Sequence, residues 1–387
     1  MYKYLWNGLA NTLTLAQVEP ILDLPVTPGP NHNGGVITFG PDGKLYVIIG
    51  DLNHNGQLQN FSSGAPDDTS VILRLNDDGA SPTDNPFSSD PNNILSRYYA
   101  YGVRNSFGMG FDPVTGNLWD TENGEGTFDE INLVNPGFNS GWERIMGPLS
   151  RDPEGDNESD LFHLSGSNYS DPKFSWFSTV APTGIVFLDS TELGGQYQND
   201  LFVGDFNNGN LYHFQPNGSR NGLVLSGSLA DLVADPNDNL AEIIFGTGFN
   251  GISDLKVGPD GFLYVVSIGD GAIYRISLAA SPLFIGVSLL PDAEAGLPYN
   301  ADLGIGGGTP PYAVSVIKGS LPNGLTPNSD GISGTPQLIK KSVFTLRVAD
   351  QVGAFVSKQF KMKVFSALNI ATSTLKNGKV EIGRAHV

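Results

Sequence analysis

The chain has 387 residues, which is too long for one typical domain, and its 40 acidic against 21 basic residues give a formal net charge of −19. That charge argues against nucleic acid as a partner, and the absence of cysteine excludes disulfides, zinc–thiolate sites and a cysteine nucleophile. No apolar stretch approaches the ~18 residues of a membrane-spanning helix. Glycine and proline, 49 and 26 residues, are spread between apolar runs and predict many short strands joined by turns.

A turn-and-strand motif recurs along the first two thirds of the chain. Residues 40–47 (GPDGKLYV) and 258–265 (GPDGFLYV) are nearly identical, and 112–119 and 198–203 repeat the pattern more weakly. Pro-Asp-Gly favours a turn, and the apolar residues after it favour a strand. The equivalent leucines are Leu45, Leu118, Leu201 and Leu263. One four-stranded sheet per period predicts a β-propeller, and a run of hairpins in a β-sandwich is the alternative.

The repeat covers residues 1–279, where we expect an incomplete propeller domain. Four copies are visible, whereas a closed ring with blades of this length needs more. The start, MYKYLW, reads as the middle of a strand and not as a signal peptide. The predicted fold is therefore all-β: a partial, N-terminally truncated six-bladed β-propeller followed by a second β domain.

The second domain is predicted over 280–367. Its runs LPNGL at 321–325 and GISGTP at 331–336 precede alternating strands at 343–350 and 360–364. This pattern resembles the immunoglobulin-like modules of secreted and cell-surface proteins and implies an immunoglobulin-like β-sandwich. Residues 368–380 read as a linker. The final EIGRAHV, 381–387, matches the translation of a common sequencing adapter, and we expect it to be an assembly artefact.

Three polar clusters are candidates for chemistry. His32 lies in NHNGG before a strand that ends at Asp51, so it could act as a general base that Asp51 orients. Arg104 and Asn105, in YGVRNSFG, suit recognition of an anionic or carbonyl oxygen. For both clusters the alternative is a loop residue bonded to nearby backbone.

The third cluster lies in residues 122–132, ENGEGTFDEIN. Carboxylates among glycines can supply oxygen ligands to calcium, although the spacing is not that of an EF-hand. Gly124, Glu125 and Glu130 are the candidate metal-binding residues. The acidic stretch 151–158 has no ligand pattern and reads as a solvated loop.

Together these segments resemble the glucose/sorbosone dehydrogenase family, the soluble PQQ-dependent aldose dehydrogenases. The resemblance covers roughly 20–278 and is carried by NHNGG…GPDGKLYVIIGD, YGVRNSFGMGFDPVTGNLW and DEINLVNPGFNSGWE, in the family's order. NSGW at 139–142 looks like the family's NYGW element. The resemblance implies an oxidoreductase that acts on a sugar, passes electrons to an external acceptor, and works outside the cytoplasm, in the periplasm, secreted or at the cell surface.

The resemblance also implies roles for individual residues. His32 matches the family's catalytic base and is also expected to contact the cofactor, and Asp51 matches its acidic support. Arg104 matches the arginine that polarises the quinone carbonyl of PQQ, and Asn105 the adjacent cofactor contact. Gly124 and Glu125 occupy the turn whose backbone carbonyls hold the cofactor-bound Ca²⁺.

Three positions depart from the family pattern. Val36 stands where the family often has arginine, Asn207 and Asn208 stand where it often has lysine, and 251–254 has none of the arginines of the glucose-oxidising members. PQQ carries three carboxylates, and each charge-assisted hydrogen bond is worth roughly 1.5–3 kcal/mol, so these changes imply weaker PQQ binding.

Two main functional hypotheses follow. The first is an extracytoplasmic oxidoreductase that oxidises aldoses at the anomeric carbon with PQQ and calcium. The second is a non-catalytic secreted propeller that binds carbohydrate or protein, as the related hedgehog-interacting proteins do. A calcium-dependent hydrolase on a propeller is a third possibility. Retention of His32, Asp51, Arg104 and Asn105 favours the enzyme, because a scaffold does not need all four.

Overall fold

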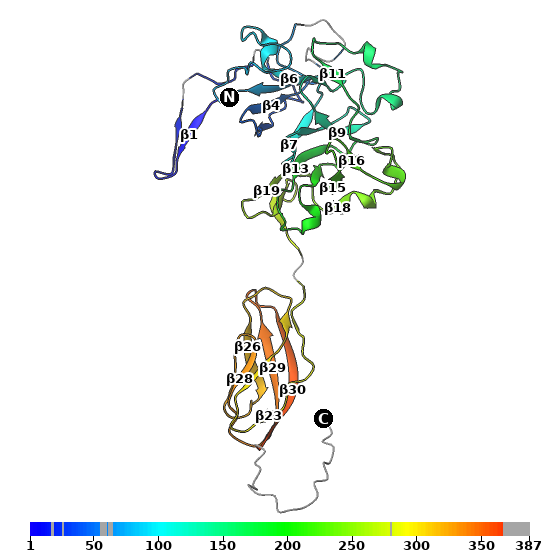
Figure 1. Cartoon of the computed structure of the whole chain (residues 1–387). Helices are drawn as coiled ribbons and strands as arrows, with labels where there is room; N and C mark the ends of the chain where they lie inside the picture. Colours follow the sequence, from blue (N-terminus) through cyan, green and yellow to red (C-terminus); the bar gives the residue numbers. More distant parts are fainter. Residues whose placement is uncertain (17–18, 25–26, 55–59, 61–64, 279–280, 367–387) are drawn as a thin grey trace, which may run out of the picture. The chain divides into compact units, whose positions relative to one another are not determined.

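The computed structural model describes the chain except for residues 17–18, 25–26, 55–59, 61–64, 279–280 and 367–387 (Figure 1). The described part is nearly all β, and its helical segments are short 3-10 turns. These turns are η1 (Ile94–Arg97), η2 (Leu149–Arg151), η3 (Glu158–Asp160), η4 (Gly195–Tyr197), η5 (Gly227–Leu229) and η6 (Leu240–Glu242). The chain divides into two compact units after residue 278. The predicted linker at 368–380 and the adapter sequence at 381–387 lie outside the described residues.

The first unit contains four sheets that follow one another along the chain, preceded by a hairpin. Their strands are antiparallel except for three parallel pairs in the first two sheets. The hairpin is β1 (Tyr4–Asn7) and β2 (Thr12–Leu15). The first sheet has β3 (Ile37–Phe39), β4 (Leu45–Ile49), β5 (Val71–Leu75) and β6 (Tyr98–Tyr101), extended by β10 (Phe138–Asn139) and β11 (Asn168–Tyr169). The second has β7 (Ser106–Phe111), β8 (Leu118–Glu122), β9 (Asp129–Val134), β12 (Phe174–Trp176) and β17 (Val233–Ala234).

The third and fourth sheets continue the same up-and-down order. The third has β13 (Pro182–Phe187), β14 (Leu201–Asp205), β15 (Leu211–Pro216) and β16 (Leu223–Val224), with β18 (Ile244–Gly246) paired to β15. The fourth has β19 (Ile252–Val257), β20 (Leu263–Ser267) and β21 (Ala272–Ile276).

The sequence repeat marks one strand in each of these sheets. Leu45, Leu118, Leu201 and Leu263 are the first residues of β4, β8, β14 and β20, and all four are buried. Each of these strands pairs with the first and the third strand of its sheet. The turn-and-strand motif therefore forms the second strand in each of four consecutive sheets, as radial repetition requires.

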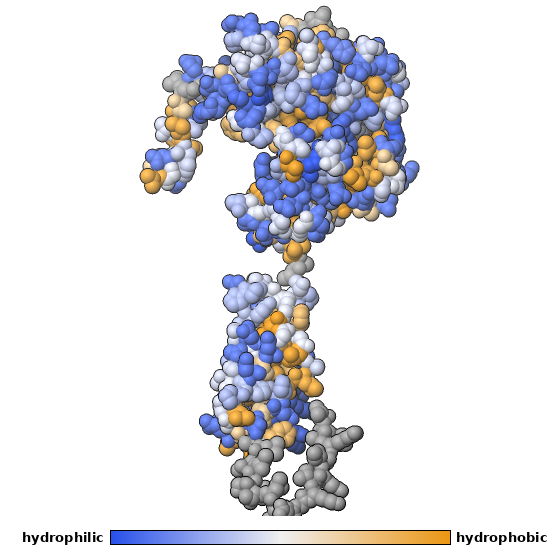
Figure 2. Space-filling model, in the orientation of Figure 1, coloured by the Kyte–Doolittle hydropathy of each residue, from blue (hydrophilic) through white to orange (hydrophobic). Residues whose placement is uncertain are grey.

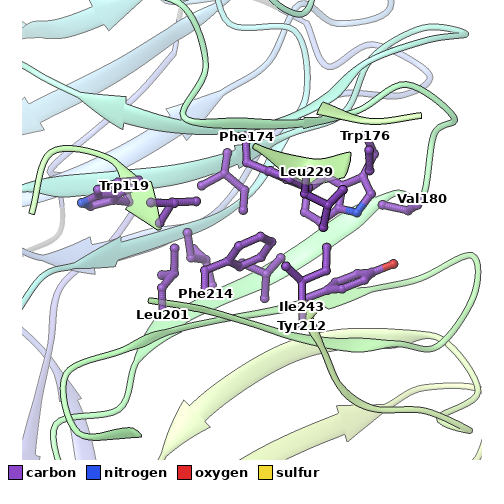
Figure 3. Packing of buried hydrophobic residues seen from close by; sticks show 14 of the residues in the cluster. Trp119, Phe174, Trp176, Val180, Leu201, Tyr212, Phe214, Leu229 and Ile243 are labelled. Atoms are coloured by element: carbon purple, nitrogen blue, oxygen red, sulfur yellow. The ribbon is translucent and has the colours of Figure 1, made fainter. Parts of the chain in front are cut away.

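The sheets pack face to face through large aromatic residues. Between the second and third sheets, Trp119, Phe174 and Trp176 meet Tyr212 and Phe214, and all five are essentially inaccessible to solvent (Figure 3). The rings of Phe174 and Phe214 lie 5.0 Å apart. Large rings buried between sheets supply most of the apolar area that holds neighbouring sheets together.

Side-chain hydrogen bonds join neighbouring sheets of the first unit. Thr121, on β8, donates its hydroxyl to the carbonyl of Thr183 on β13 at 2.7 Å. Thr183 in turn donates its hydroxyl to the carbonyl of Ile252 on β19 at 2.7 Å. Side-chain hydroxyls thus link three sheets near the starts of β13 and β19.

The second unit is a β-sandwich. One sheet has the order β23 (Ala293–Glu294), β30 (Phe355–Phe365), β29 (Lys341–Ala349) and β26 (Ala313–Gly319). The other has β24 (Tyr299–Asp302), β28 (Gly331–Gly334) and β27 (Leu325–Pro327), and β22 (Phe284–Ile285) pairs with β25 (Ile305–Gly306). Leu303, Ile332, Phe344, Leu346 and Val348 form the centre of its core. In the described residues of the whole chain, no helix is long and apolar enough to cross a membrane.

Candidate active site

The predicted site residues belong to loops at one edge of the first two sheets. In an antiparallel sheet, the start of the first strand and the end of the second lie at the same edge. His32 precedes β3 and Asp51 follows β4, whereas Arg104 precedes β7 and Gly124 follows β8. The topology therefore brings together residues that are up to 92 positions apart in the sequence.

His32 and Asp51 form a close pair. His32 Nδ1 lies 2.6 Å from Asp51 Oδ1, and the Asp51 side chain is fully buried. Burial raises the pKa of Asp51, but hydrogen bonds from His32, the Asn53 amide and Trp142 outweigh it and hold that pKa below its usual value. Asp51 is therefore an ionised carboxylate that fixes the orientation of the His32 ring and leaves Nε2 as the nitrogen available for chemistry.

Trp142 is the second partner of this carboxylate. Its indole Nε1–H donates to Asp51 Oδ2 at 2.9 Å, so both oxygens of Asp51 are held. The Arg104 guanidinium lies over the Trp142 ring, 5.1 Å from its centroid. Trp142 thus contacts both the histidine–aspartate pair and the candidate cofactor-binding arginine.

Arg104 is tied to the same loops through its backbone and its side chain. The Asp51 amide donates to the Arg104 carbonyl at 2.8 Å. The Arg104 guanidinium Nη1 donates to the carbonyls of Asn123 at 2.7 Å and Gly124 at 2.9 Å. Its Nε is buried and has no hydrogen-bond partner among the described residues. This N–H is therefore an available donor for a ligand.

Two adjoining cavities share Asn105 and Phe107 as a common wall. The first, about 430 Å³, is lined by Asn31, His32, Asn33, Gly34, Asn105 and Phe107. The second, about 400 Å³, is lined by Arg104, Asn105, Phe107, Asn123, Gly124, Asp129, Thr179, Ala181, Thr183, Phe206 and Asn207. Both have the size of small-molecule sites in proteins. His32 therefore lies in one cavity and Arg104 in the neighbouring one.

Asp129 supports the second cavity from within its wall. One carboxylate oxygen accepts the Gly124 amide at 2.8 Å, and the other accepts the amides of Val180 and Ala181 at 2.6 and 2.7 Å. Burial raises the pKa of Asp129, and these three amides oppose that shift. Asp129 fixes the loop after β8 against the loop before β13.

Three buried carboxyl groups lie behind the site on β8 and β9. Glu122 accepts the Arg104 amide and the Ser140 hydroxyl, each at 2.6 Å, and pairs across the strands with Glu130. Burial raises the pKa of Glu130 to about 8 and that of Asp120, two residues before Glu122, to about 7. Burial and its two carboxylate neighbours raise the pKa of Glu122 as well. These three carboxyl groups therefore stay protonated at pH values at which isolated carboxyl groups would be ionised.

The candidate metal-binding residues have separate partners. Glu125 is exposed and lies 3.4 Å from His54 Nε2, whereas Glu130 accepts the Gly147 amide at 2.5 Å inside the sheet. The Gly124 carbonyl accepts the Arg104 guanidinium. Across the described ranges, no three histidine, cysteine, aspartate or glutamate side chains come together as a metal site.

Several site residues were not singled out from the sequence. Trp142 and Asp129 are in the NSGW and DEINL segments, but their roles depend on contacts 91 and 51–52 positions away. His54 is a third such residue, because the sequence shows no partner for it. It lies between Glu125 and Glu143, 3.4 and 3.5 Å from their carboxylates, and its ring is 5.5 Å from that of Trp142. Only the proximity of His54 to Asp51 in the sequence could have pointed to it.

Comparisons with known proteins identify relatives of this chain. Aldose sugar dehydrogenase YliI of Escherichia coli is 28% identical over 259 residues, covering 66% of this chain and 62% of that protein. Quinoprotein glucose dehydrogenase B of Acinetobacter calcoaceticus is 34% identical over 160 residues, covering 38% and 32%. A crystal structure of a glucose dehydrogenase, 22% identical, superposes with a TM-score of 0.51 over 70% of each chain and shares the fold. The chain thus spans about three-fifths or less of the length of the curated relatives it matches.

The fold prediction is confirmed at the level of an all-β propeller-type unit followed by an immunoglobulin-like unit. An Ig-domain family model matches residues 282–365. The number of blades and the expected truncation stay predictions. The Glucose / Sorbosone dehydrogenase model matches residues 8–275, more than half of the chain, and the chain belongs to that family.

Proposed function

We propose that this protein is an extracytoplasmic oxidoreductase that oxidises aldose sugars at the anomeric carbon. PQQ is the proposed cofactor, and an external acceptor takes the electrons. The single observation that supports this most is the link between the two halves of the site. The Asp51 amide binds the Arg104 carbonyl, so the His32–Asp51 pair and Arg104 are held at adjoining cavities.

His32 is the proposed catalytic base. With Nδ1 engaged by Asp51, Nε2 takes the proton of the anomeric hydroxyl as the hydride leaves C1, and the aldose becomes its lactone. Asp51 stabilises the charge that develops on the imidazole during this transfer. When bound, the quinone supplies the acceptor of the hydride and its electron pair.

The described residues fit the quinone of PQQ better than they fit calcium. The buried Arg104 Nε–H and the adjacent Asn105 suit a quinone carbonyl oxygen in the 400 Å³ cavity. The carbonyls of Asn123 and Gly124, by contrast, already accept the Arg104 guanidinium. Calcium does not fit these carbonyls as they stand, and the proton transfer proposed here does not depend on it.

One observation favours the second candidate, a non-catalytic propeller that binds carbohydrate or protein. Of the described residues that line the 400 Å³ cavity, Arg104 is the one cation, and Asp129 adds a negative charge. Three carboxylates of PQQ would find few cationic partners there.

The experiment that separates the candidates is reconstitution of the protein with PQQ and calcium. Reduction of a redox dye is then followed with a panel of aldoses. A quinone spectrum with sugar-dependent turnover supports the enzyme, and sugar binding without either supports the alternative. In the enzyme, His32→Ala should abolish turnover while the PQQ affinity changes little. Equal loss of both would contradict the assignment of His32 as base.

A further inference from the structure

One sheet of the immunoglobulin-like unit has a charge opposite to that of the chain. The net charge of the chain is −19, yet strands β26, β29 and β30 contain no aspartate or glutamate. Their basic residues are Lys318, Lys341, Arg347, Lys358, Lys361 and Lys363. This segregation is the reverse of what solubility alone requires of an acidic protein.

Most of these cations share the outer face of the sheet. Along β29 and β30, side chains alternate between the core, where Phe344 and Met362 are buried, and the outer face, where Lys341, Lys361 and Lys363 are exposed. Lys358 is the exception, because its Nζ donates to the carbonyl of Val287 at 2.6 Å. We call the outer side chains of β26, β29 and β30, together with residues 338–340, the basic face.

The cations of the basic face are not neutralised within it. Lys341 lies directly opposite Lys363 in the strand register, and like charges at such positions repel. In the described part of the chain, no ion pair joins any cation of this face to a carboxylate. Two carboxylates adjoin one end: Asp292 accepts the Lys363 amide at 2.7 Å, and Glu294 pairs with the end of β30. They leave the face with a clear excess of positive charge.

Large apolar side chains are exposed among these cations. Ile317, Leu338, Ile339, Val343, Phe355 and Phe365 are each at least half exposed. Leu338 and Ile339 immediately precede Lys340 and Lys341, and the Lys340 carbonyl accepts the Val364 amide, which holds this loop beside Lys363. Apolar and polar side chains alternate on the visible surface of this unit (Figure 2). Basic and large apolar side chains therefore lie together on this face of the unit.

We infer that the basic face is a docking surface for a membrane that contains anionic lipids. Lysines beside such a membrane are attracted to its negative surface, and exposed aliphatic and aromatic side chains enter the boundary between headgroups and acyl chains. An acidic polysaccharide would also bind the lysines, but it would leave Leu338 and Ile339 exposed to water. Because a membrane buries these apolar side chains as well, we favour lipid as the partner. This inference does not depend on the proposed enzymatic function.

The test is flotation of the whole chain with lipid vesicles. We expect binding to phosphatidylcholine vesicles that contain about 30 mol% phosphatidylglycerol and none to pure phosphatidylcholine. Raising the salt from about 0.1 M to 0.5 M should weaken binding at least ~tenfold. Because the net charge of the chain opposes adsorption to an anionic surface, binding would identify a local site.

Two double variants separate the charge from the apolar contribution. Lys341→Glu with Lys363→Glu should reduce the partition coefficient at least ~tenfold, since each lysine contributes roughly fivefold. Leu338→Ser with Ile339→Ser should reduce it several-fold at both salt concentrations. The matched controls are Val352→Ser, at the opposite end of the β29–β30 hairpin, and Lys256→Glu, on β19 of the first unit. Both should bind like the unaltered chain.

Several results would overturn the inference. They are equal binding to neutral vesicles, binding that survives the double lysine reversal, and no vesicle binding at all. Lysine-dependent binding to polygalacturonate without vesicle binding would instead identify an acidic polysaccharide as the partner. Circular dichroism of each variant shows whether the fold is retained.

Discussion

Trp142 donates its indole N–H to the Asp51 carboxylate at 2.9 Å, and this bond joins two parts of the site that are 91 positions apart. Asp51 holds His32 with its other oxygen, and Arg104 lies over the same indole ring. One buried side chain thus orients the proposed base through Asp51 and packs against the proposed cofactor-binding cation. Trp142 acts through these residues, so it is a positioning residue.

Replacing Trp142 by phenylalanine keeps an aromatic ring but removes the donor. A buried carboxylate oxygen then loses its partner, a change that costs about 1–3 kcal/mol. We expect kcat to fall about 5–150-fold on the same scale while KM and PQQ affinity change little. Trp119→Phe is the control, because its buried indole N–H has no partner among the described residues. Equal effects of the two substitutions on kcat would show that the Trp142–Asp51 bond does not matter.

Replacing Asp51 by asparagine removes the charge that orients His32. The amide cannot stabilise a protonated imidazole, and its NH₂ group can present a donor to Nδ1. We expect turnover to fall by a factor on the order of 10²–10⁴, with the quinone spectrum of the loaded protein unchanged. Stopped-flow reduction by sugar measures this directly. Retention of near-normal reduction rates would rule out a role for Asp51 in proton transfer.

Replacing Arg104 by lysine tests the cofactor site. An ammonium is a compact point charge and cannot reproduce the guanidinium contacts to the Asn123 and Gly124 carbonyls while presenting Nε to a ligand. We expect PQQ affinity to fall at least ~tenfold, since a charge-assisted bond contributes about 1.5–3 kcal/mol. Arg144→Lys, in a loop bound to Asp156, is the matched control. Unchanged PQQ affinity in the Arg104 variant would place the cofactor elsewhere.

Asp120 gives a prediction for the pH dependence of stability. Its Oδ1 and the Oδ1 of Asn132, opposite it in the strand register, are both buried without partners among the described residues. Burial raises the pKa of Asp120 from 3.8 to about 7, so the folded state binds a proton that the unfolded state releases. The stability from this group is present at low pH and is lost as the pH rises through about 7.

Asp120→Asn should therefore flatten the pH profile of the free energy of unfolding. An amide is neutral at every pH and can donate to the Asn132 oxygen. Between about pH 5 and 8, the unaltered protein should lose on the order of 2–4 kcal/mol more than the variant. Denaturant titrations at both pH values measure this difference. Parallel pH profiles would show that Asp120 is ionised in the folded protein throughout.

Local sequence rules predicted the strands better than the contacts of the site. The turn before Leu45 and Leu263 and the apolar run after it are short-range signals, and each leucine begins a strand of the same rank in its sheet. His32 and Asp51 lie 19 positions apart at the two ends of one hairpin, so their pairing follows from topology. Trp142 could not be placed this way, because its bond to Asp51 depends on how the loop after β10 folds back toward the end of β4.

The Gly124 carbonyl has a partner that its sequence motif does not reveal. The motif indicated a calcium-binding turn, but the motif cannot show that the Arg104 guanidinium reaches that carbonyl from 20 positions away. Which of several acceptors a long side chain binds depends on the positions of the loops in the folded protein. The partners of backbone oxygens therefore follow from the folded loops and not from the motif.

In the proposed reaction, a sugar delivers hydride to a quinone held beside His32 and Arg104. The most direct test is anaerobic mixing of the PQQ-loaded protein with glucose, or with glucose deuterated at C1, while the quinone absorbance is recorded. We expect loss of the oxidised-quinone band, and this loss should be several-fold slower with the deuterated sugar. A quinone spectrum that no aldose changes would contradict it.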